Sequence, residues 1–237
     1  VWKPGIDQHL VASKVVDEQV KYPAATSLQT ENICPNMTNE TFAQRMMELR
    51  DEAVELIGLR LGELERWDQL AKDRILEWFG DPGLGRRTAH LSDLRPYLAT
   101  GIQSLEHVLR GLQPKNFVRW SPTTHEHVGC VNPAPDRQGV VAQVCKPDTK
   151  TRTIAILSLF CGLRRTTRIH GTHRFYDNDS QLQTLIHEAT HFADVFNSTD
   201  DWYGMRKAKE MLHSTGDFQI ARANADSIVG YIMGAER

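Results

Sequence analysis

The feature that most constrains this chain is a His-Glu-x-x-His pattern at residues 187–191. The apolar residues around it recur at helical spacing, which predicts an amphipathic helix with one side in a core. These residues are Leu182, Leu185, Ile186, Ala189, Phe192 and Phe196. Two histidines four residues apart lie above one another on a helix face, so His187 and His191 can reach one Zn²⁺ ion. A packed opposite face would hold both imidazoles rigidly, as a metal site requires.

The residues beside the two histidines suggest how such a site would work. Glu188 follows the first histidine and can approach a metal-bound water as a general base. A catalytic zinc usually takes three protein ligands and leaves one position for water. Asp194, Asp200 and Asp201 are all candidates for the third ligand, since the next histidine is His213. The alternative is that both histidines face solvent on an amphipathic helix and bind no metal.

The run of residues 179–204 resembles the aspzincin metallopeptidases, which comprise deuterolysin and the peptidyl-Lys metalloendopeptidases. Those proteins pair His-Glu-x-x-His with a downstream Gly-Thr-x-Asp-x-x-Tyr-Gly. Aligned on Tyr203 and Gly204, the resemblance implies that Asp200 is the third ligand and that Tyr203 stabilises the oxyanion. The Gly-Thr opening is replaced here by Asn197 and Ser198. A second family signature, Asn-Ala-Asp-Ser, stands at residues 224–227, and the resemblance covers roughly residues 34–237.

The resemblance implies an α+β, predominantly helical zincin-like domain with a small β-sheet. The implied activity is zinc-dependent hydrolysis of peptide bonds inside proteins, with one zinc per chain and a metal-bound water activated by Glu188 as general base. Two alternatives keep the same chemistry: a bacterial toxin or effector delivered into another cell, and a zinc amidase acting on cell-wall peptides. A binding module with a decayed site is disfavoured because metal binding alone does not need Glu188.

The resemblance also bears on substrate choice. In the peptidyl-Lys branch, the aspartate of Asn-Ala-Asp-Ser and an acid three positions later line the pocket for the side chain after the cleaved bond. The aspartate matches Asp226, whose charge would favour a basic side chain. The second position holds Val229, so at most a moderate basic preference is expected. The alternative is that Asp226 only anchors its helix to the metal loop.

Four cysteines are spread along the chain without a Cys-x-x-Cys pair: Cys34, Cys130, Cys145 and Cys161. An even number fits two disulfides and an oxidising compartment, with free buried thiols as the alternative. By analogy with the family, Cys161 is expected to pair with Cys130, and Cys34 with Cys145. The expected location is secreted or extracellular, or, for a delivered effector, another cell or the periplasm.

The composition of the 237 residues, 40% hydrophobic and 24% charged, is ordinary for a globular protein. A net charge of −2 gives no electrostatic reason to expect nucleic acid or an anionic membrane. No apolar run approaches the ~20 residues of a membrane span. The expected partners are therefore protein or peptide substrates, with a pro-segment, a delivery domain, or an immunity or inhibitor protein as further candidates. The basic run 164–174 could suggest nucleic acid or a second metal, but a solvated loop near the cleft is favoured.

The rest of the chain divides at about residue 33. Residues 1–33 are weakly periodic and are interpreted as an arm, a linker or the remnant of a pro-segment, and residues 34–237 as the metallopeptidase domain. The chain begins with Val1 and has no signal peptide, so it is interpreted as a processed or cut product.

Local patterns predict where the elements lie. Helical periodicity runs from residue 38 or 39 to 79, and a break is expected near residues 58–62 because a single helix of ~40 residues is too long for a compact domain. A loop at residues 83–88 and a helix from about 92 to 112 should follow. Short strands are expected within 117–120, 127–128, 139–144 and 153–160, the last two forming a hairpin. Asp179 or Ser180 should cap the His-Glu-x-x-His helix, and two further helices are expected at about 205–213 and 217–235.

Overall fold

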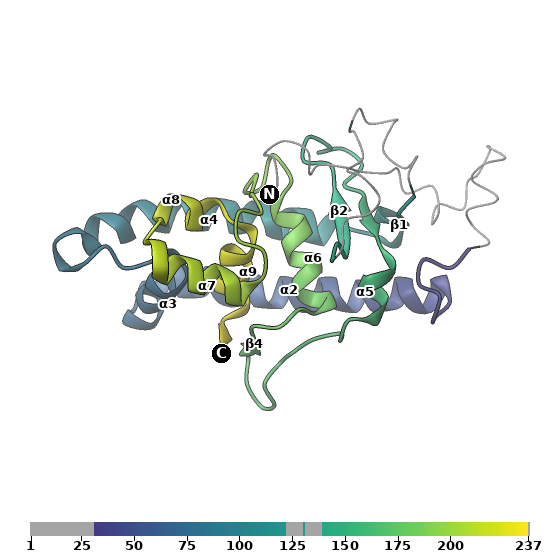
Figure 1. Cartoon of the computed structure of the whole chain (residues 1–237), viewed down its shortest axis with the longest axis horizontal. Coiled ribbons are helices and arrows are strands. Elements are labelled where there is room, and N and C mark those ends of the chain that lie inside the picture. Colours follow the sequence, from purple (N-terminus) through teal and green to yellow (C-terminus); the bar gives the residue numbers. More distant parts are fainter. Residues whose placement is uncertain (1–30, 122–129, 131–138, 237) are drawn as a thin grey trace.

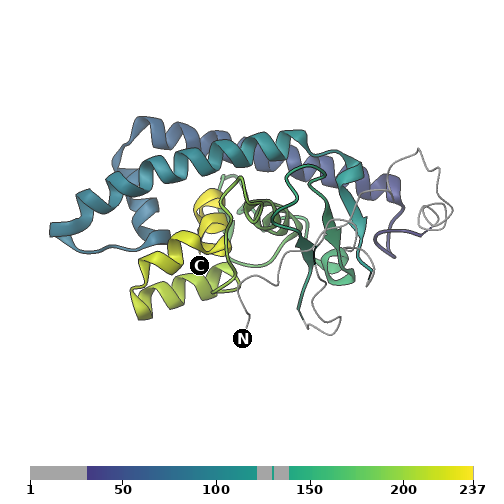
Figure 2. The ribbon, with the colours of Figure 1, turned by 90° about the horizontal axis from the view of Figure 1, so that it is seen from above.

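The structure is a computed structural model that describes residues 31–121, 130 and 139–236. Two long helices, α2 (Asn39–Arg66) and α4 (Leu84–Gly111), run side by side along the molecule (Figure 1, Figure 2). The shorter α3 (Gln69–Phe79) connects them at one end. Most of the described chain is helical and a small three-stranded sheet packs beside the helices, which confirms the predicted fold class.

The expected break in the first helix is misplaced. Helix α2 continues through residues 58–62 for 28 residues, and the chain turns instead at Trp67, which has a left-handed backbone with φ 52°. Asp68 then caps α3 by accepting the backbone N–H of Ala71 at 2.9 Å. A helix of this length spans about 42 Å. Such a long helix can be part of a compact domain because α4 packs alongside it. The predicted end of the helical region at residue 79 is confirmed, with Gly80 as the C-cap.

Helix α4 begins earlier than expected, at Leu84, so the predicted loop at residues 83–88 is wrong. Asp81 gives the physical reason. Its carboxylate accepts the N–H of Gly83 at 2.9 Å and pairs with Arg87 in the first turn of α4. A negative charge at the start of a helix stabilises it, because it attracts the backbone N–H groups of the first turn that have no partner within the helix.

The sheet has three short strands in the order β1-β3-β2, with β2 at one edge. Strands β2 and β3 pair in antiparallel fashion, which confirms the predicted hairpin, whereas β1 lies parallel to β3. The run 153–160 is only partly a strand, because a helical turn, α5 (Ser158–Gly162), follows β3. The strand expected at residues 127–128 lies outside the described residues. The strands are β1 (Phe117–Arg119), β2 (Ala142–Val144) and β3 (Ile154–Ile156).

The C-terminal part surrounds helix α6 (Gln181–Thr190), which lies in the middle of the molecule (Figure 1). Packing against α2, α4, α9 and β2 buries all ten of its residues. A two-stranded parallel sheet, which the sequence did not predict, joins the segment before α6 to the chain end. The remaining elements are β4 (Phe175–Tyr176), α7 (Met205–Thr215), α8 (Phe218–Ala223), α9 (Ala225–Met233) and β5 (Ala235–Glu236).

The helix expected at residues 217–235 is divided in two. Asn224 separates α8 from α9 with an extended backbone, φ −76° and ψ 126°. Its backbone pairs with Thr199 in a parallel bridge, so the break serves a contact with the loop after α6. Within the described residues, none of the helices combines the length and the apolarity that a membrane crossing needs.

Two disulfides are present, but the predicted pairing is wrong. Cys34 pairs with Cys161 and Cys130 pairs with Cys145. Cys34 precedes α2, and Phe42 in the first turn of α2 contacts the ring of Phe160 in α5, which brings Cys34 to Cys161. The side-chain amide of Asn36 also donates a hydrogen bond to the carbonyl of Cys161 at 3.3 Å. Spacing along the chain gave no signal for this pairing, because it depends on how α2 and α5 pack between segments 127 residues apart.

Candidate metal centre

Helix α6 places both histidines of the sequence pattern in the interior. Ser180 caps the helix by accepting the N–H of Gln183 at 3.2 Å, as predicted. The rings of His187 and His191 lie 4.8 Å apart between centroids and nearly perpendicular, at 80°. His191 is the residue after the last turn and keeps helical backbone angles, φ −71° and ψ −25°. The expected face with two adjacent imidazoles is therefore formed.

A sharp turn follows α6 and returns the chain to the histidines. Asn197 has a left-handed backbone, φ 50°, at the position where the related motif has glycine. Asparagine adopts this conformation more readily than most residues. The next residue, Ser198, is fully buried and its N–H bonds to the carbonyl of Thr190 at 3.3 Å. Its own carbonyl oxygen lies 3.0 Å from Nδ1 of His191. The substitution of Gly-Thr by Asn-Ser thus preserves the turn.

The turn brings one of the three candidate carboxylates to the histidines. Oδ1 of Asp200 lies 3.0 Å from Nε2 of His187 and 3.4 Å from Nε2 of His191. Asp194 instead forms an ion pair with Arg152, and the exposed Asp201 accepts a hydrogen bond from the Thr199 hydroxyl at 2.6 Å. Among the described residues, His187, His191 and Asp200 form the group whose ligand atoms lie close enough to share one metal ion, within 4.8 Å of one another.

The pKa values of these side chains are shifted because the groups are buried and lie close to one another. Burial favours the neutral form of Asp200, but the two imidazoles outweigh it and hold its pKa well below the usual range. Burial likewise lowers the pKa of His187, whereas Asp226 and Asp200 raise it well above normal. Burial raises the pKa of Glu188, which is only 6% exposed beside the histidines.

Tyr203 lies at the open side of the group. Its ring centroid is 5.7 Å from that of His187, and the residue is 52% exposed. Desolvation raises the pKa of its hydroxyl, so the group stays protonated and can donate a hydrogen bond at neutral pH. The structure therefore brings Tyr203 to the two histidines, Glu188 and Asp200.

The Asn-Ala-Asp-Ser segment supports the loop that carries Asp200. Asn224 is fully buried, accepts the N–H of Trp202 at 2.9 Å and donates to the carbonyl of the same residue at 3.1 Å. The N–H of Thr199 bonds to the carbonyl of Ala223 at 2.8 Å. Periodicity alone offered no signal for this role of Asn224, and only the motif marked the segment.

Asp226 lies beneath the same loop. It is 1% exposed and accepts hydrogen bonds from the N–H of Gly204 at 2.7 Å and from Nε2 of Gln183 at 3.1 Å. Its Oδ1 is also 3.4 Å from Nδ1 of His187. These contacts match the alternative in which Asp226 anchors its helix to the loop. Val229 is buried in the main core, and the described lining of the recess beside Asp226 does not include it.

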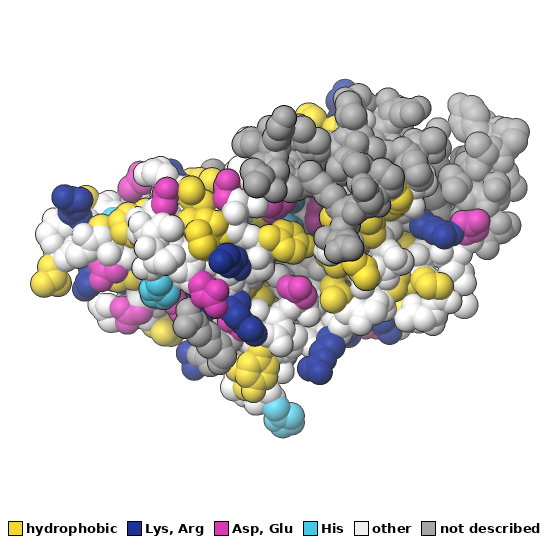
Figure 3. Space-filling view, viewed as in Figure 1, with side chains coloured by type: hydrophobic (Ala, Val, Ile, Leu, Met, Phe, Trp, Pro, Cys, Tyr) yellow, Lys and Arg dark blue, Asp and Glu magenta, His cyan; other side chains and the backbone are white. Residues whose placement is uncertain are grey.

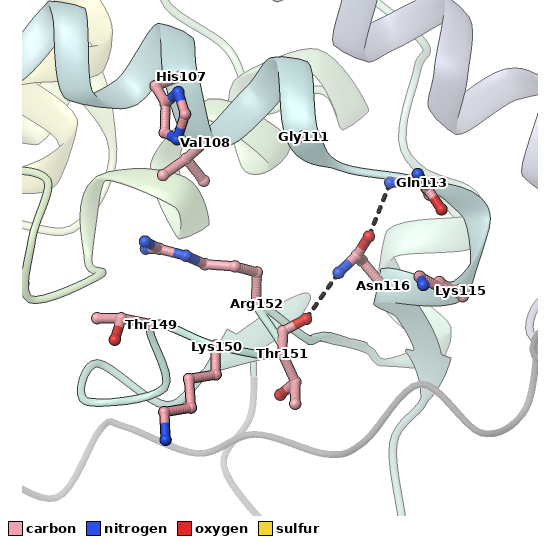
Figure 4. A pocket seen from close by; sticks show the side chains of 10 residues that line it. All are labelled: His107, Val108, Gly111, Gln113, Lys115, Asn116, Thr149, Lys150, Thr151 and Arg152. Carbon is pink, nitrogen blue, oxygen red and sulfur yellow. Dashed lines mark hydrogen bonds between the residues drawn. The ribbon is translucent and has the colours of Figure 1, made fainter.

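A second pocket, which the sequence did not indicate, lies apart from this group. A pocket of about 480 Å³ between α4 and the turn before β3 is lined by basic and polar side chains, among them His107, Lys115 and Lys150 (Figure 4). Arg152 extends into it and pairs with Asp194, which fixes the turn after α6. This pocket shares no described lining residue with the histidine group.

The basic run 164–174 is largely exposed, as a solvated loop would be, and two of its arginines are held against α2. Arg165 and Arg168 form ion pairs with Glu52 of α2, at 3.0 Å and 2.7 Å. These contacts bind the run to the helix surface and neutralise part of its charge. On the face of the molecule shown in Figure 3, the described acidic and basic side chains are interspersed.

Comparisons with known proteins agree with this arrangement. Residues 117–232 match the profile of the aspzincin family, described as lysine-specific metallo-endopeptidase. The fold is similar to that of a zinc peptidase from Grifola frondosa, with a TM-score of 0.56 and 18% identity over 82% of this chain and 95% of that one. No curated protein sequence matches the chain significantly. The profile match contains the histidine group and the Asn-Ala-Asp-Ser segment. The part of the chain from residue 117 to 232 is therefore similar to the aspzincin family of metallo-endopeptidases, and both comparisons support a peptide-bond hydrolase.

Proposed function

We propose that the chain is a zinc endopeptidase that binds one zinc ion per chain through His187, His191 and Asp200. The observation that carries this proposal is the state of Asp200 Oδ1. This atom is buried and has no hydrogen-bond partner among the described residues, although both imidazole Nε2 atoms are within 3.4 Å. Two imidazoles and a carboxylate form a donor set that suits Zn²⁺ and leaves a fourth position open. The residues present therefore fit the ion.

When bound, zinc supplies a Lewis acid that polarises the scissile carbonyl and lowers the pKa of water. The protein supplies the proton transfer. Glu188 accepts the proton of the attacking water and then passes it to the amine that leaves. Its burial raises its pKa, which makes the carboxylate a stronger base than an exposed glutamate.

Tyr203 and the edge strand are the proposed substrate contacts. The protonated hydroxyl of Tyr203 can donate to the carbonyl oxygen as negative charge develops on it. Strand β2 is the edge of the described sheet and packs against α6, so an extended peptide can add to the sheet there. Both assignments place the substrate across the open side of the histidine group.

We further propose that the protein acts outside the reducing cytosol. Its four cysteines form two disulfides, and such bonds persist in oxidising compartments.

The proposal is tested with Glu188→Gln. This change removes the base and keeps a side chain of the same size, so proteolysis should fall to background while bound zinc remains at the wild-type amount. Metal analysis and digestion of a denatured protein are measured on the same samples. Loss of zinc from the variant, or substantial remaining proteolysis, would show that the role given to Glu188 is wrong.

A further inference from the structure

A groove of about 490 Å³ lies between the C-terminal half of α2 and α3, and residues of the segment before β4 also line it. This volume is within the range of ligand pockets in proteins. The groove shares no described lining residue with the histidine group, so it is a separate feature of the molecule.

Two glycines leave the backbone of α2 open to this groove. Gly58 and Gly62 are four residues apart, so they lie one above the other on one helix face, and both line the groove. Nothing lies within 4 Å of a Cβ built at Gly58, so the packing of the chain itself does not require glycine there. A glycine inside a helix costs about 0.5–1 kcal/mol relative to alanine, and it is the residue that lets another molecule approach the backbone closely.

The side chains around the groove are apolar and basic. Leu59 and Leu70 line it and are exposed to solvent. Arg60, Arg66 and Arg74 line it too. A surface of this kind complements a partner that carries apolar and acidic side chains next to one another.

Two of these arginines share a single carboxylate. Nη1 of Arg60 lies 2.9 Å from Oε2 of Glu63, and Nε of Arg74 lies 3.0 Å from the same oxygen. The three side chains are at most 11% exposed, and Nε of Arg60 is buried without a hydrogen-bond partner among the described residues. The C-terminal end of α9 is close, since a Cβ built at Gly234 would lie 2.6 Å from Nη1 of Arg74, but a helix end supplies only about half a negative charge. The group therefore keeps an excess of positive charge.

An anion in the groove would remove this excess. Burial and the charge of Arg74 lower the pKa of Arg60 to about 10, so the guanidinium stays charged at neutral pH. A buried charge without a full set of partners is costly. The side chain of Arg74 is partly accessible and that of Arg66 is exposed, so a carboxylate can reach both from solvent. Arginine and carboxylate form strong, often bidentate hydrogen bonds.

We propose that this groove binds an acidic segment of a partner protein, with a carboxylate on Arg74 and Arg66 and an apolar side chain on Leu59 and Leu70. The open backbone at Gly58 lets the main chain of that segment approach α2. A second copy of this chain does not suit the groove, because a two-fold contact would bring the arginines of both copies together. The inference is independent of the proposed function.

The test measures binding of two acetylated, amidated heptapeptides by calorimetry. One alternates aspartate with leucine, and the other has asparagine at every aspartate. The full chain with Glu188→Gln is used with zinc present, so that the probes are not cut. The aspartate peptide should bind at least about tenfold more tightly than the asparagine peptide, as for hydrogen bonds to a charged group.

Two substitutions in the groove locate the binding. Gly58→Leu fills the groove and should weaken binding of the aspartate peptide at least about tenfold, the loss expected when the contact with the arginines is blocked. It should not unfold the chain, because leucine favours a helix and nothing lies near that position. Arg66→Gln removes an exposed charge and should weaken binding by roughly twofold to fivefold.

The matched controls are on α4, away from the groove. Gly85→Leu adds the same side chain at an exposed helix glycine that also has open space around it, and Arg86→Gln removes an exposed charge. Both should leave binding unchanged. Thermal unfolding checks that each variant is folded.

Several results would overturn the inference. These are equal binding of the two peptides, binding of neither, no effect of Gly58→Leu, or an equal loss in Gly85→Leu. Sedimentation of the same samples tests the other occupant: a dimer that Gly58→Leu dissociates would show that a second copy, not an acidic partner, fills the groove.

Discussion

The two histidines owe their orientation to neighbours that do not touch the proposed ion. Nδ1 of His191 contacts the carbonyl oxygen of Ser198, and Nδ1 of His187 faces Asp226. Metal-binding histidines commonly use their second nitrogen in this way, which fixes the tautomer and the plane of the ring. As a result, both Nε2 atoms are directed to Asp200.

The choice of third ligand can be tested with two neighbouring aspartates. Asp200→Asn removes the charge at the proposed ligand, so zinc affinity should fall by at least about tenfold, the smallest effect typical of residues that support a metal site. Asp201→Asn is the matched control and should leave affinity nearly unchanged, because that side chain is exposed and bonds to Thr199. Competition with a chromophoric chelator measures both. A larger loss in the Asp201 variant would move the ligand by one residue.

Some site residues were accessible from the sequence and others were not. Helical spacing alone identified His187, Glu188 and His191. Asp200 could not be separated from Asp194 and Asp201 by spacing, and only the family motif selected it. Gln183, Ser198 and Asn224 gave no signal as individual residues. Their partners lie across turns or more than twenty residues away, and such contacts exist only after the elements have packed.

At the scale of elements, α3 and α9 are held by a close helix contact that depends on a small residue. Gly230 in α9 faces the ring of Trp78 in α3, and a Cβ built at Gly230 would lie 2.1 Å from that ring. Gly58 in α2 has open space around the same position. A side chain at Gly230 would therefore clash with Trp78, whereas one at Gly58 would meet no neighbour.

This contrast gives a stability prediction. Gly230→Ala should lower the free energy of unfolding by about 1–3 kcal/mol or more, because the methyl group overpacks the core against a buried tryptophan. Gly58→Ala should raise it by roughly 0.5–1 kcal/mol through better helix propensity. Urea unfolding of both variants measures these changes. Equal effects of the two substitutions would contradict the packing of α9 on α3.

The glycines of α2 bear on an error in the sequence prediction. A break was expected near residues 58–62 because a helix of ~40 residues is too long for a compact domain, but Gly58 and Gly62 each cost the helix only about 1 kcal/mol relative to alanine. Packing on α4 exceeds that cost, and the helix continues. The actual turn depends on Trp67 and on the Asp68 cap. Element type was therefore predictable for long periodic runs, whereas boundaries depended on tertiary contacts and caps.

At the scale of the whole molecule, the two disulfides stabilise very different lengths of chain. Cys34 and Cys161 are 127 residues apart and tie the start of α2 to α5, whereas Cys130 and Cys145 are 15 apart. In the chain-entropy model, a longer loop loses more freedom in the unfolded state when it is closed.

Replacing each pair with serine should therefore destabilise the protein unequally. Removal of Cys34–Cys161 should cost about 5 kcal/mol, and removal of Cys130–Cys145 about 3 kcal/mol. Denaturant unfolding measures the order, and peptide mapping under non-reducing conditions checks the pairing itself. A disulfide between Cys130 and Cys161 in that map would contradict the structure.

The most direct test of the central claim is a zinc titration of the metal-free chain, with cleavage of a denatured protein followed at each step. Internal peptide bonds should be cut only as zinc is added, and the rate should level off at one equivalent per chain, because His187, His191 and Asp200 form a single site. Tight binding of one zinc without any cleavage of peptide bonds, or cleavage that is unaffected by removal of the metal, would contradict the assignment.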